Sequence, residues 1–292
     1  MIIKLAEHFG LCFGVRDAIA QAERLAEQGP LTILGELVHN PVVRARLASA
    51  GVKESRLDGG SSTAEVMITA HGASDSARDA WRSKGFGVAD GTCPLVRHAH
   101  EQLRVLVQLG YSPVIIGKHG HVEVLGLSGD FPGAIVIGCE ADIEHLPSSG
   151  RFGVISQTTQ PIDRVTTLVA ALRAARPDAE IRFVDTVCQP TKNRQLALQK
   201  LLAECDTLVV VGGRNSNNTQ QLVAAAEKAG RKALHIEQAE ELDPGWFRFS
   251  RVVGITAGTS TLKETVAGVH ARLLKFAAEY SVLTALENSG VR

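Results

Sequence analysis

The sequence predicts an α/β fold in which three similar α/β units with mainly parallel sheets surround a pseudo-threefold axis. Apolar, strand-like runs alternate with helix-like segments along all 292 residues, which is typical of parallel sheets covered by helices. The second observation is a repeat: Cys, two residues, Val or Thr, and then a basic residue recur at Cys12, Cys93 and Cys188. Each copy follows a strand-like segment and precedes an amphipathic helical one, so we expect three copies of one structural unit.

The repeat divides the chain into units of residues 1–92, 93–187 and 188–292. The strand-like runs inside these units are, in order, LTILGEL and EVMITAHG, SPVIIGKHG and RFGVISQT, and DTLVVVGG and RVVGITAG. The first two units end in a further strand that runs into the next cysteine, whereas the third ends in a helix. Because the N-terminus begins with one spare strand, we predict that residues 2–7 complete the sheet of the third unit.

Every unit also presents two polar strand ends. The first set lies 27 or 28 residues after the cysteines and the second set follows the next strand; they are His39, His121 and Ser216, and then His71, Thr158 and Ser260. In open parallel sheets, ligands bind beyond the carboxyl ends of the strands, where helices begin. Three units around one axis would therefore bring three thiols and six polar tips to a common centre.

Composition and charge exclude several classes of function. Lys and Arg balance Asp and Glu at 31 each, which argues against a nucleic-acid binder driven by phosphate electrostatics. The sequence begins without a basic segment followed by a long apolar run, and no apolar run approaches the roughly 18 residues that span a bilayer. We therefore expect a cytoplasmic protein with neither nucleic-acid nor membrane partners. The five cysteines are too irregularly spaced for a disulfide framework.

Three convergent cysteines cannot all pair as disulfides, but they can hold a metal centre and leave one coordination position open. Zinc with three thiolates and a water fits this pattern, and so does a 4Fe–4S cluster with one unligated iron. Helix N-termini favour the thiolate form that either centre requires. Cys139 and Cys205 lack the repeated context, and we expect both to be structural, since free cysteine is among the most buried residue types.

The polar tips suit an anionic ligand. Any one of these side chains could simply cap the following helix, but together they form donors at helix N-termini, where phosphate binds well; they are His39, His71, His121, Thr158, Ser216, Asn218 and Ser260. Glu123 is the one carboxylate among the tips, at a helix start that the macrodipole favours for it. An ionised carboxylate cannot assist anion binding, so its functional interpretation is proton delivery.

With these residues assembled, the chain resembles the 4-hydroxy-3-methylbut-2-enyl diphosphate reductase family, also called the LytB family. The similarity covers nearly the whole length, and its motifs occur in the family's order; they are GLCFGV, VHNP, AHG, TCPLV, GHVEV, SQTTQ, GGRNSNNT and ITAGTST. No single motif would be sufficient, but their number and order make the resemblance highly specific.

The resemblance implies an oxidoreductase of isoprenoid biosynthesis that uses a 4Fe–4S cluster on Cys12, Cys93 and Cys188, with an unligated apical iron. It implies that the substrate hydroxyl meets that iron, and that Glu123, His121 and Thr158 act in catalysis. The allylic diphosphate would lie among His39, His71, His121, Ser216, Asn218 and Ser260. Reductive loss of the hydroxyl as water would give isopentenyl and dimethylallyl diphosphate, and a small ferredoxin or flavodoxin would be a suitable electron donor.

Two other functions are compatible with the residues alone. A hydro-lyase could use the same open iron, but it would consume no electrons. A non-catalytic cluster protein that senses redox state or a diphosphate would keep the three thiols and would have no need of Glu123.

Overall fold

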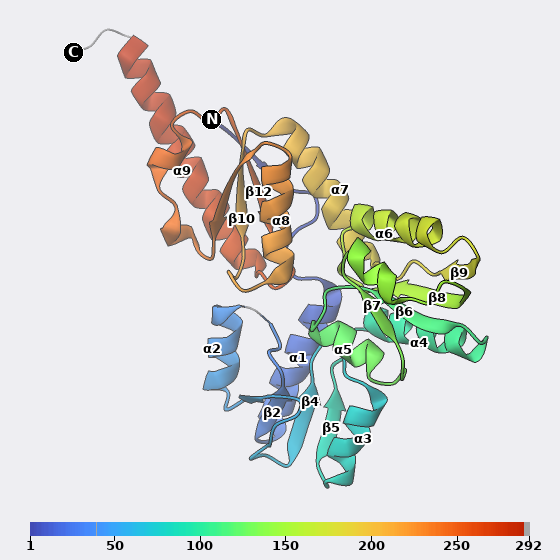
Figure 1. Ribbon diagram of the computed structural model, residues 1–292. Helices are drawn as coiled ribbons and strands as arrows, with labels where there is room; N and C mark the ends of the chain where they lie inside the picture. The colour runs from blue at the N-terminus through green and yellow to red at the C-terminus, as the bar shows by residue number, and fades with distance from the viewer. Residues whose placement is uncertain (39, 289–292) are drawn as a thin grey trace. The chain divides into compact units, whose positions relative to one another are not determined.

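Three four-stranded sheets, each with all its strands parallel, form the framework of the computed structural model, which describes residues 1–38 and 40–288 (Figure 1). The first sheet has the order β3-β2-β4-β5, with bounds Lys53–Ser55, Leu31–Leu34, Glu65–Ile68 and Gly87–Asp90. The second has the order β7-β6-β8-β9, with bounds Ile135–Ile137, Ser112–Ile116, Gly150–Ser156 and Ala179–Phe183. The third has the order β1-β12-β10-β11, with bounds Ile2–Leu5, Val252–Ala257, Thr207–Val211 and Lys232–Ile236. The predicted α/β class with parallel sheets is confirmed.

The three sheets share one topology. Within each repeat the first strand pairs with the second on one side and with the third on the other, and a fourth strand lies beyond the third. In the third sheet that fourth place is taken by β1, which pairs in parallel with β12 from Ile2 opposite Val252 to Leu5 opposite Ile255. The N-terminal strand therefore completes the third sheet, as its sequence position predicted. Each repeated cysteine follows the fourth strand of a sheet: β5, β9 or β1.

Helices connect the strands in each repeat. The first repeat contains α1 (Phe13–Gln28), α2 (Pro41–Ser49) and α3 (Asp75–Ser83); the second contains α4 (Pro94–Gln108), α5 (Val122–Ser128), the 3₁₀ helix η1 (Glu140–His145) and α6 (Ile162–Ala175). The third contains α7 (Gln189–Glu204), α8 (Asn217–Lys228), the 3₁₀ helices η2 (Ala239–Glu241) and η3 (Pro244–Phe247), and α9 (Lys263–Asn288). Among residues 1–38 and 40–288, no helix combines the length and apolar character that a membrane span requires.

The chain forms two compact units. One, the third-sheet unit, comprises Met1–Cys12, Val38–Arg44 and Asn193–Arg292; the other, the two-sheet unit, comprises Phe13–Leu37 and Ala45–Lys192. The unit boundaries at residues 93 and 188 and the pseudo-threefold axis remain predictions.

Both faces of the central strands are buried, which explains their continuous apolar sequences. In the second sheet, Val114 and Val154 point into one core together with Leu168 and Leu172 of α6. Successive side chains of a strand alternate between faces, so Ile115 packs into a separate core on the opposite face with residues of α4 and α5. The third sheet has the same arrangement, with cores on its two faces built from α9 and from α7 and α8. These cores fix the strand ends on which the polar tips stand.

The pairing of β1 generates the first prediction. Ile2 N and Ala6 N donate to Arg251 O and Ile255 O, at 2.8 and 2.9 Å. Because donors alternate along a strand, the N–H of Lys4 also faces β12, whereas that of Leu5 faces away from the sheet. Lys4→Pro should lower the unfolding free energy by about 1–3 kcal/mol more than Leu5→Pro, since it leaves a buried acceptor unpaired.

Urea unfolding followed by circular dichroism measures the difference, and Lys4→Ala controls for loss of the exposed lysine side chain, which pairs with Glu204. Equal destabilisation by the two proline substitutions would contradict the pairing register.

Candidate active site

In the two-sheet unit, side chains that follow strands of the two different sheets lie close together. His71 follows β4 of the first sheet, and His121 follows β6 of the second. Their rings meet edge to face with centroids 5.8 Å apart. Cys93 is connected to the same place, because its N–H donates to the carbonyl of Ala70, next to His71, at 3.0 Å. The first sheet thus presents a cysteine and a histidine together.

The contacts continue through the second sheet. His121 is the N-cap of α5, and its Nδ1 accepts the N–H of Glu123 at 3.1 Å. The carboxylate Oε1 of Glu123 in turn accepts the N–H of Thr158 at 2.6 Å. The carbonyl of Thr158 accepts the N–H of Cys188 at 2.9 Å. A continuous path of contacts therefore links the anchors of Cys93 and Cys188, and it passes through the predicted catalytic residues His121, Glu123 and Thr158.

Glu123 has the electrostatics of a proton-holding group. Its side chain is buried, with only 2% of the residue exposed. Burial raises the pKa of Glu123 to about 7, because the charged form loses its hydration, and the hydrogen bonds from Thr158 act in the opposite direction. A carboxyl group with a pKa near neutrality can be protonated or ionised at physiological pH, which is the property that general acid catalysis requires.

Both repeated cysteines of this unit stand at helix starts. Cys93 is the N-cap of α4, and Pro94 occupies the first helical position, where no backbone donor is needed. Cys188 directly precedes α7, and its Sγ lies 3.1 Å from Thr191 Oγ1. Both side chains are half-buried.

Gly14 shapes the space around Cys93. A Cβ atom at Gly14, the second residue of α1, would lie 2.4 Å from the Sγ of Cys93. Only glycine permits this close approach, so the sequence keeps the volume beside the thiol open. Gly14 stands two residues after Cys12 in the sequence. Half-buried thiols at helix N-termini, beside a space without a side chain, fit a bound metal centre.

The third-sheet unit assembles the other predicted tips. Ser216 is the N-cap of α8, and its hydroxyl accepts the N–H of Thr219 at 3.3 Å. Asn218 Oδ1 accepts the N–H of Thr259, which joins the first turn of α8 to the tip after β12, next to Ser260. These are the capping contacts that the residue types suggest, and the ligand role of Ser216 and Asn218 remains a prediction. His39 lies outside the described residues.

Cys12 belongs to the third-sheet unit and is half-buried. The residues before it run along the end of β12, where Gly10 N donates to Ala257 O and Leu11 N to Thr261 O, at 3.2 and 3.1 Å. Cys12 therefore follows its strand end as Cys93 and Cys188 follow theirs. The convergence of all three thiols on one centre remains a prediction.

Sequence reasoning did not identify two positioning residues. Asn40, which is 8% exposed, caps α2 through Val42 and Val43 and donates from Nδ2 to Ser260 O at 2.8 Å. Gln157 is fully buried, and its Oε1 accepts the N–H of Lys118 at 3.0 Å, which ties the tip of β8 to that of β6. The motifs VHNP and SQTTQ contain these residues, but their partners are distant in sequence.

The expectation for the two remaining cysteines is half right. Cys205 is buried in the third-sheet unit, and burial raises the pKa of its thiol. Cys139 is exposed at the start of η1, beside Asp142. Cys139 is therefore not the buried residue that its type suggests, because it follows a short strand and enters a surface turn.

A cavity of about 330 Å³ adjoins Glu123 in the two-sheet unit. Three arginines and, besides Glu123, three carboxylates line it: Arg78, Arg97 and Arg104, with Asp75, Asp90 and Glu101. Because these charges balance, the cavity offers no excess of positive charge to hold a diphosphate. Binding of such a group would fall to the histidines and the neutral donors.

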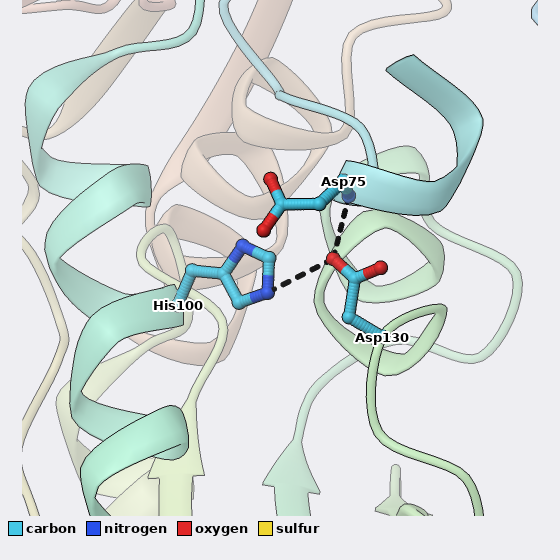
Figure 2. A group of neighbouring side chains, drawn as sticks. All are labelled: Asp75, His100 and Asp130. Atoms are coloured by element: carbon cyan, nitrogen blue, oxygen red, sulfur yellow. Dashed lines mark hydrogen bonds and ion pairs between the residues drawn. The ribbon is translucent and has the colours of Figure 1, made fainter. Parts of the chain in front are cut away.

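Asp75, His100 and Asp130 lie close together beside this cavity, with their nearest potential ligand atoms within 4.8 Å of one another (Figure 2). His100 Nε2 lies 3.2 Å from Asp130 Oδ2. Asp75, however, already pairs with Arg78 and Arg104, and Asp130 accepts backbone N–H groups at the start of α3. Because both carboxylates already have partners, the contacts favour a structural connection between α3, α4 and the turn after α5 over a metal site.

Known proteins are similar to this chain in sequence and in fold. A family model described as LytB protein matches residues 3–274. The chain belongs to the LytB protein family. Its relatives named 4-hydroxy-3-methylbut-2-enyl diphosphate reductase include one from Aquifex aeolicus, 36% identical over 93% of this chain and 95% of the relative. Another, from Geotalea daltonii, is 38% identical over 90% of this chain and 93% of the relative.

A solved structure agrees with the family assignment. The E-1-hydroxy-2-methyl-but-2-enyl-4-diphosphate reductase from Plasmodium falciparum has a TM-score of 0.83 to this LytB-family chain at 27% identity, covering 91% of this chain and 86% of the other. Because the relatives are reductases, the chain is an enzyme, and an oxidoreductase.

The space beside Cys93 gives a second prediction. Gly14→Ala should destabilise the chain by about 1–3 kcal/mol through overpacking, although alanine has the higher helix propensity. It should also change the alkylation rate of Cys93, measured by mass spectrometry.

Gly29→Ala is the matched control near the other end of α1, because nothing lies within 4 Å of its added Cβ. A Gly14→Ala variant as stable as the wild type, with unchanged Cys93 reactivity, would contradict the packing described here.

The raised pKa of Glu123 gives a third prediction. The folded chain holds the Glu123 proton up to about pH 7, whereas the unfolded chain releases it near the ordinary pKa of the side chain, 4.5. Stability from this group is therefore present at low pH and is lost as the pH rises from about 4.5 to 7. Relative to Glu123→Gln, the wild type should lose roughly 3 kcal/mol of unfolding free energy over this range.

Urea unfolding at several pH values measures this difference, with Glu144→Gln as a control at an exposed position. A constant difference between wild type and Glu123→Gln would mean that the buried carboxyl group titrates normally.

Proposed function

We propose that this enzyme reduces 4-hydroxy-3-methylbut-2-enyl diphosphate to isopentenyl and dimethylallyl diphosphate, the last step of the methylerythritol phosphate route to isoprenoids. The allylic C–O bond breaks; two electrons and two protons are consumed, one proton leaving with the hydroxyl as water and the other entering the carbon skeleton. The names of the relatives support this substrate. The observation that carries the proposal is the path of contacts from Cys93 through His71, His121, Glu123 and Thr158 to Cys188.

The diphosphate would be bound by the histidines and neutral donors that the sequence predicts at the strand tips. These are His39, which lies outside the described residues, and His71, His121, Ser216, Asn218 and Ser260. His121 illustrates the chemistry, because its Nδ1 accepts a backbone N–H and the neutral ring therefore carries its proton on Nε2. That N–H would donate to a phosphate oxygen of the bound substrate, and the partial positive charge at the N-terminus of α5 would act in the same direction.

Glu123 would hold the proton that the leaving hydroxyl takes. Its pKa of about 7 keeps a substantial protonated fraction at neutral pH, and its burial excludes bulk water from the transfer. The Thr158 N–H fixes one carboxylate oxygen. The Thr158 hydroxyl would orient the substrate hydroxyl towards this carboxyl group, and His121 would orient the neighbouring phosphate.

Cys12, Cys93 and Cys188 would hold a 4Fe–4S cluster with an unligated apical iron. When bound, such a cluster supplies a Lewis-acidic iron for a poor leaving group and delivers electrons one at a time. Zinc fits the three thiolates equally well as a ligand set, but it has no redox chemistry and cannot serve a reductase in this way. A small ferredoxin or flavodoxin in the cytoplasm is the proposed electron donor.

The direct test is anaerobic reconstitution with iron and sulfide, followed by metal analysis and an assay coupled to a reductant. We expect about four irons per chain, with two electrons consumed for each diphosphate converted. Conversion without electron consumption would instead identify a hydro-lyase, and a cluster without turnover would identify a sensor.

Three variants separate the roles of these residues. Cys93→Ser should lose or destabilise the cluster, whereas the matched Cys139→Ser should keep its iron. Glu123→Gln should keep both cluster and substrate binding and lose about 10²-fold or more in turnover, since proton transfer contributes that much. A full iron content in Cys93→Ser, or normal turnover in Glu123→Gln, would contradict the assignment.

A further inference from the structure

Two aspartates stand at equivalent places ahead of two of the repeated cysteines. Asp90 lies three residues before Cys93, and Asp185 lies three residues before Cys188. Oδ1 of Asp90 accepts the N–H of Thr92 at 3.0 Å, and Oδ1 of Asp185 accepts the N–H of Val187 at 3.0 Å. Each aspartate therefore closes an Asx turn that fixes the backbone immediately before its cysteine.

The second carboxylate oxygen of each aspartate pairs with a basic residue that follows the cysteine in the sequence. Asp90 Oδ2 lies 3.1 Å from Arg97 Nη2, and Asp185 Oδ2 lies 2.6 Å from Lys192 Nζ. Each basic residue stands four positions after its cysteine, in the helix that follows. One carboxylate thus ties the segment before the thiol to the helix after it, in both repeats.

A third contact is also repeated. The N–H of Cys93 donates to Ala70 O and that of Cys188 to Thr158 O, at 3.0 and 2.9 Å, so the backbone of each cysteine is anchored to the end of a neighbouring strand. Turn, ion pair and backbone anchor together leave each cysteine backbone little freedom. They act on the backbone of the residue that carries the thiol and not on the sulfur atom itself.

The first repeat provides an internal comparison. Phe9 stands three residues before Cys12, and Arg16 pairs at 3.3 Å with Asp17, its neighbour in α1. Among the residues that the structure describes, no aspartate therefore connects the segment before Cys12 to Arg16, although a helix begins after this cysteine. Starting a helix after a cysteine does not require the bridge, so the bridge at Cys93 and Cys188 needs another explanation.

We propose that Asp90 and Asp185 are positioning residues that hold Cys93 and Cys188 in the geometry required for metal ligation. The inference rests on the cluster site proposed above. Ligands fixed in advance by their neighbours bind metal more tightly, because less freedom is lost on binding. Neither aspartate touches the metal. Cys12, which lacks the bridge, is the ligand whose backbone gains most of its order from cluster binding.

The test uses the full-length reconstituted chain and four variants: Asp90→Ala, Asp90→Asn, Asp185→Ala and Asp185→Asn. Asparagine keeps the oxygen that closes the Asx turn and loses the ion pair, whereas alanine loses both. The readouts are the rate of iron loss to a chelator and the electron paramagnetic resonance spectrum of the reduced cluster. Alkylation rates of Cys93 and Cys188 in the metal-free chain give a readout that is independent of the cluster.

We expect the alanine variants to lose iron about tenfold faster or more, as removal of a ligand's supporting contact generally causes. The asparagine variants should recover part of the loss, and the alanine variants should show faster alkylation and an altered spectrum. Asp58→Ala is the matched control, since Asp58 also pairs with an arginine two residues away but stands far from the repeated cysteines in sequence.

Alanine variants that retain iron, spectrum and alkylation rates at wild-type levels would overturn the proposal. If an alanine variant does not fold, Arg97→Met and Lys192→Met remove the ion pairs to these arginine and lysine side chains and leave the turns in place. Wild-type behaviour in both methionine variants and in the asparagine variants would also overturn the proposal. A wild-type chain that takes up no iron would instead refute the proposed function, and the alkylation rates would still decide whether the aspartates order the thiols.

Discussion

The parallel direction of the strands is the constraint on which the site depends. Because every strand of a sheet ends at the same edge, the polar tips and the helix starts of one repeat collect there. Helix N-termini carry partial positive charge, so this edge favours thiolates and phosphate oxygens. In the two-sheet unit, polar tips collect at the strand ends of both sheets. The tip after β4 and the tip after β6 place His71 and His121 in ring contact.

Glu123 shows how the fold sets the chemistry of a single group. The short helix α5 begins at a histidine cap and buries Glu123 against the tip of β8, where its partner is a backbone N–H and not a cation. The carboxyl group is desolvated without receiving a compensating positive charge, so its pKa rises to about 7. The balanced charges of the adjoining cavity leave this effect intact. In the proposed function, proton holding and anion binding would therefore fall to different side chains.

The sequence predicts features that depend on local pattern and on repetition. The alternation of strand-like and helix-like segments predicts the α/β class, and counting strands predicts that β1 completes the third sheet, both of which the structure confirms. Features that need tertiary contacts could not be foreseen. The bond from Asn40 to Ser260 O and the approach of Gly14 to Cys93 each depend on segments that are distant in sequence. Asp90 and Asp185 are an intermediate case. Their shared spacing before the cysteines can be read from the sequence, but their hydrogen bonds and ion pairs can be seen only in the structure.

In the proposed site, three thiols, one from each repeat, hold one 4Fe–4S cluster in which one iron has no protein ligand. Mössbauer spectroscopy of the chain reconstituted with ⁵⁷Fe measures this most directly. Three cysteine ligands for four irons predict one distinct iron site of one-quarter intensity, whose signal shifts when the hydroxylated diphosphate is added. Four equivalent irons, or a spectrum that the diphosphate leaves unchanged, would contradict the claim.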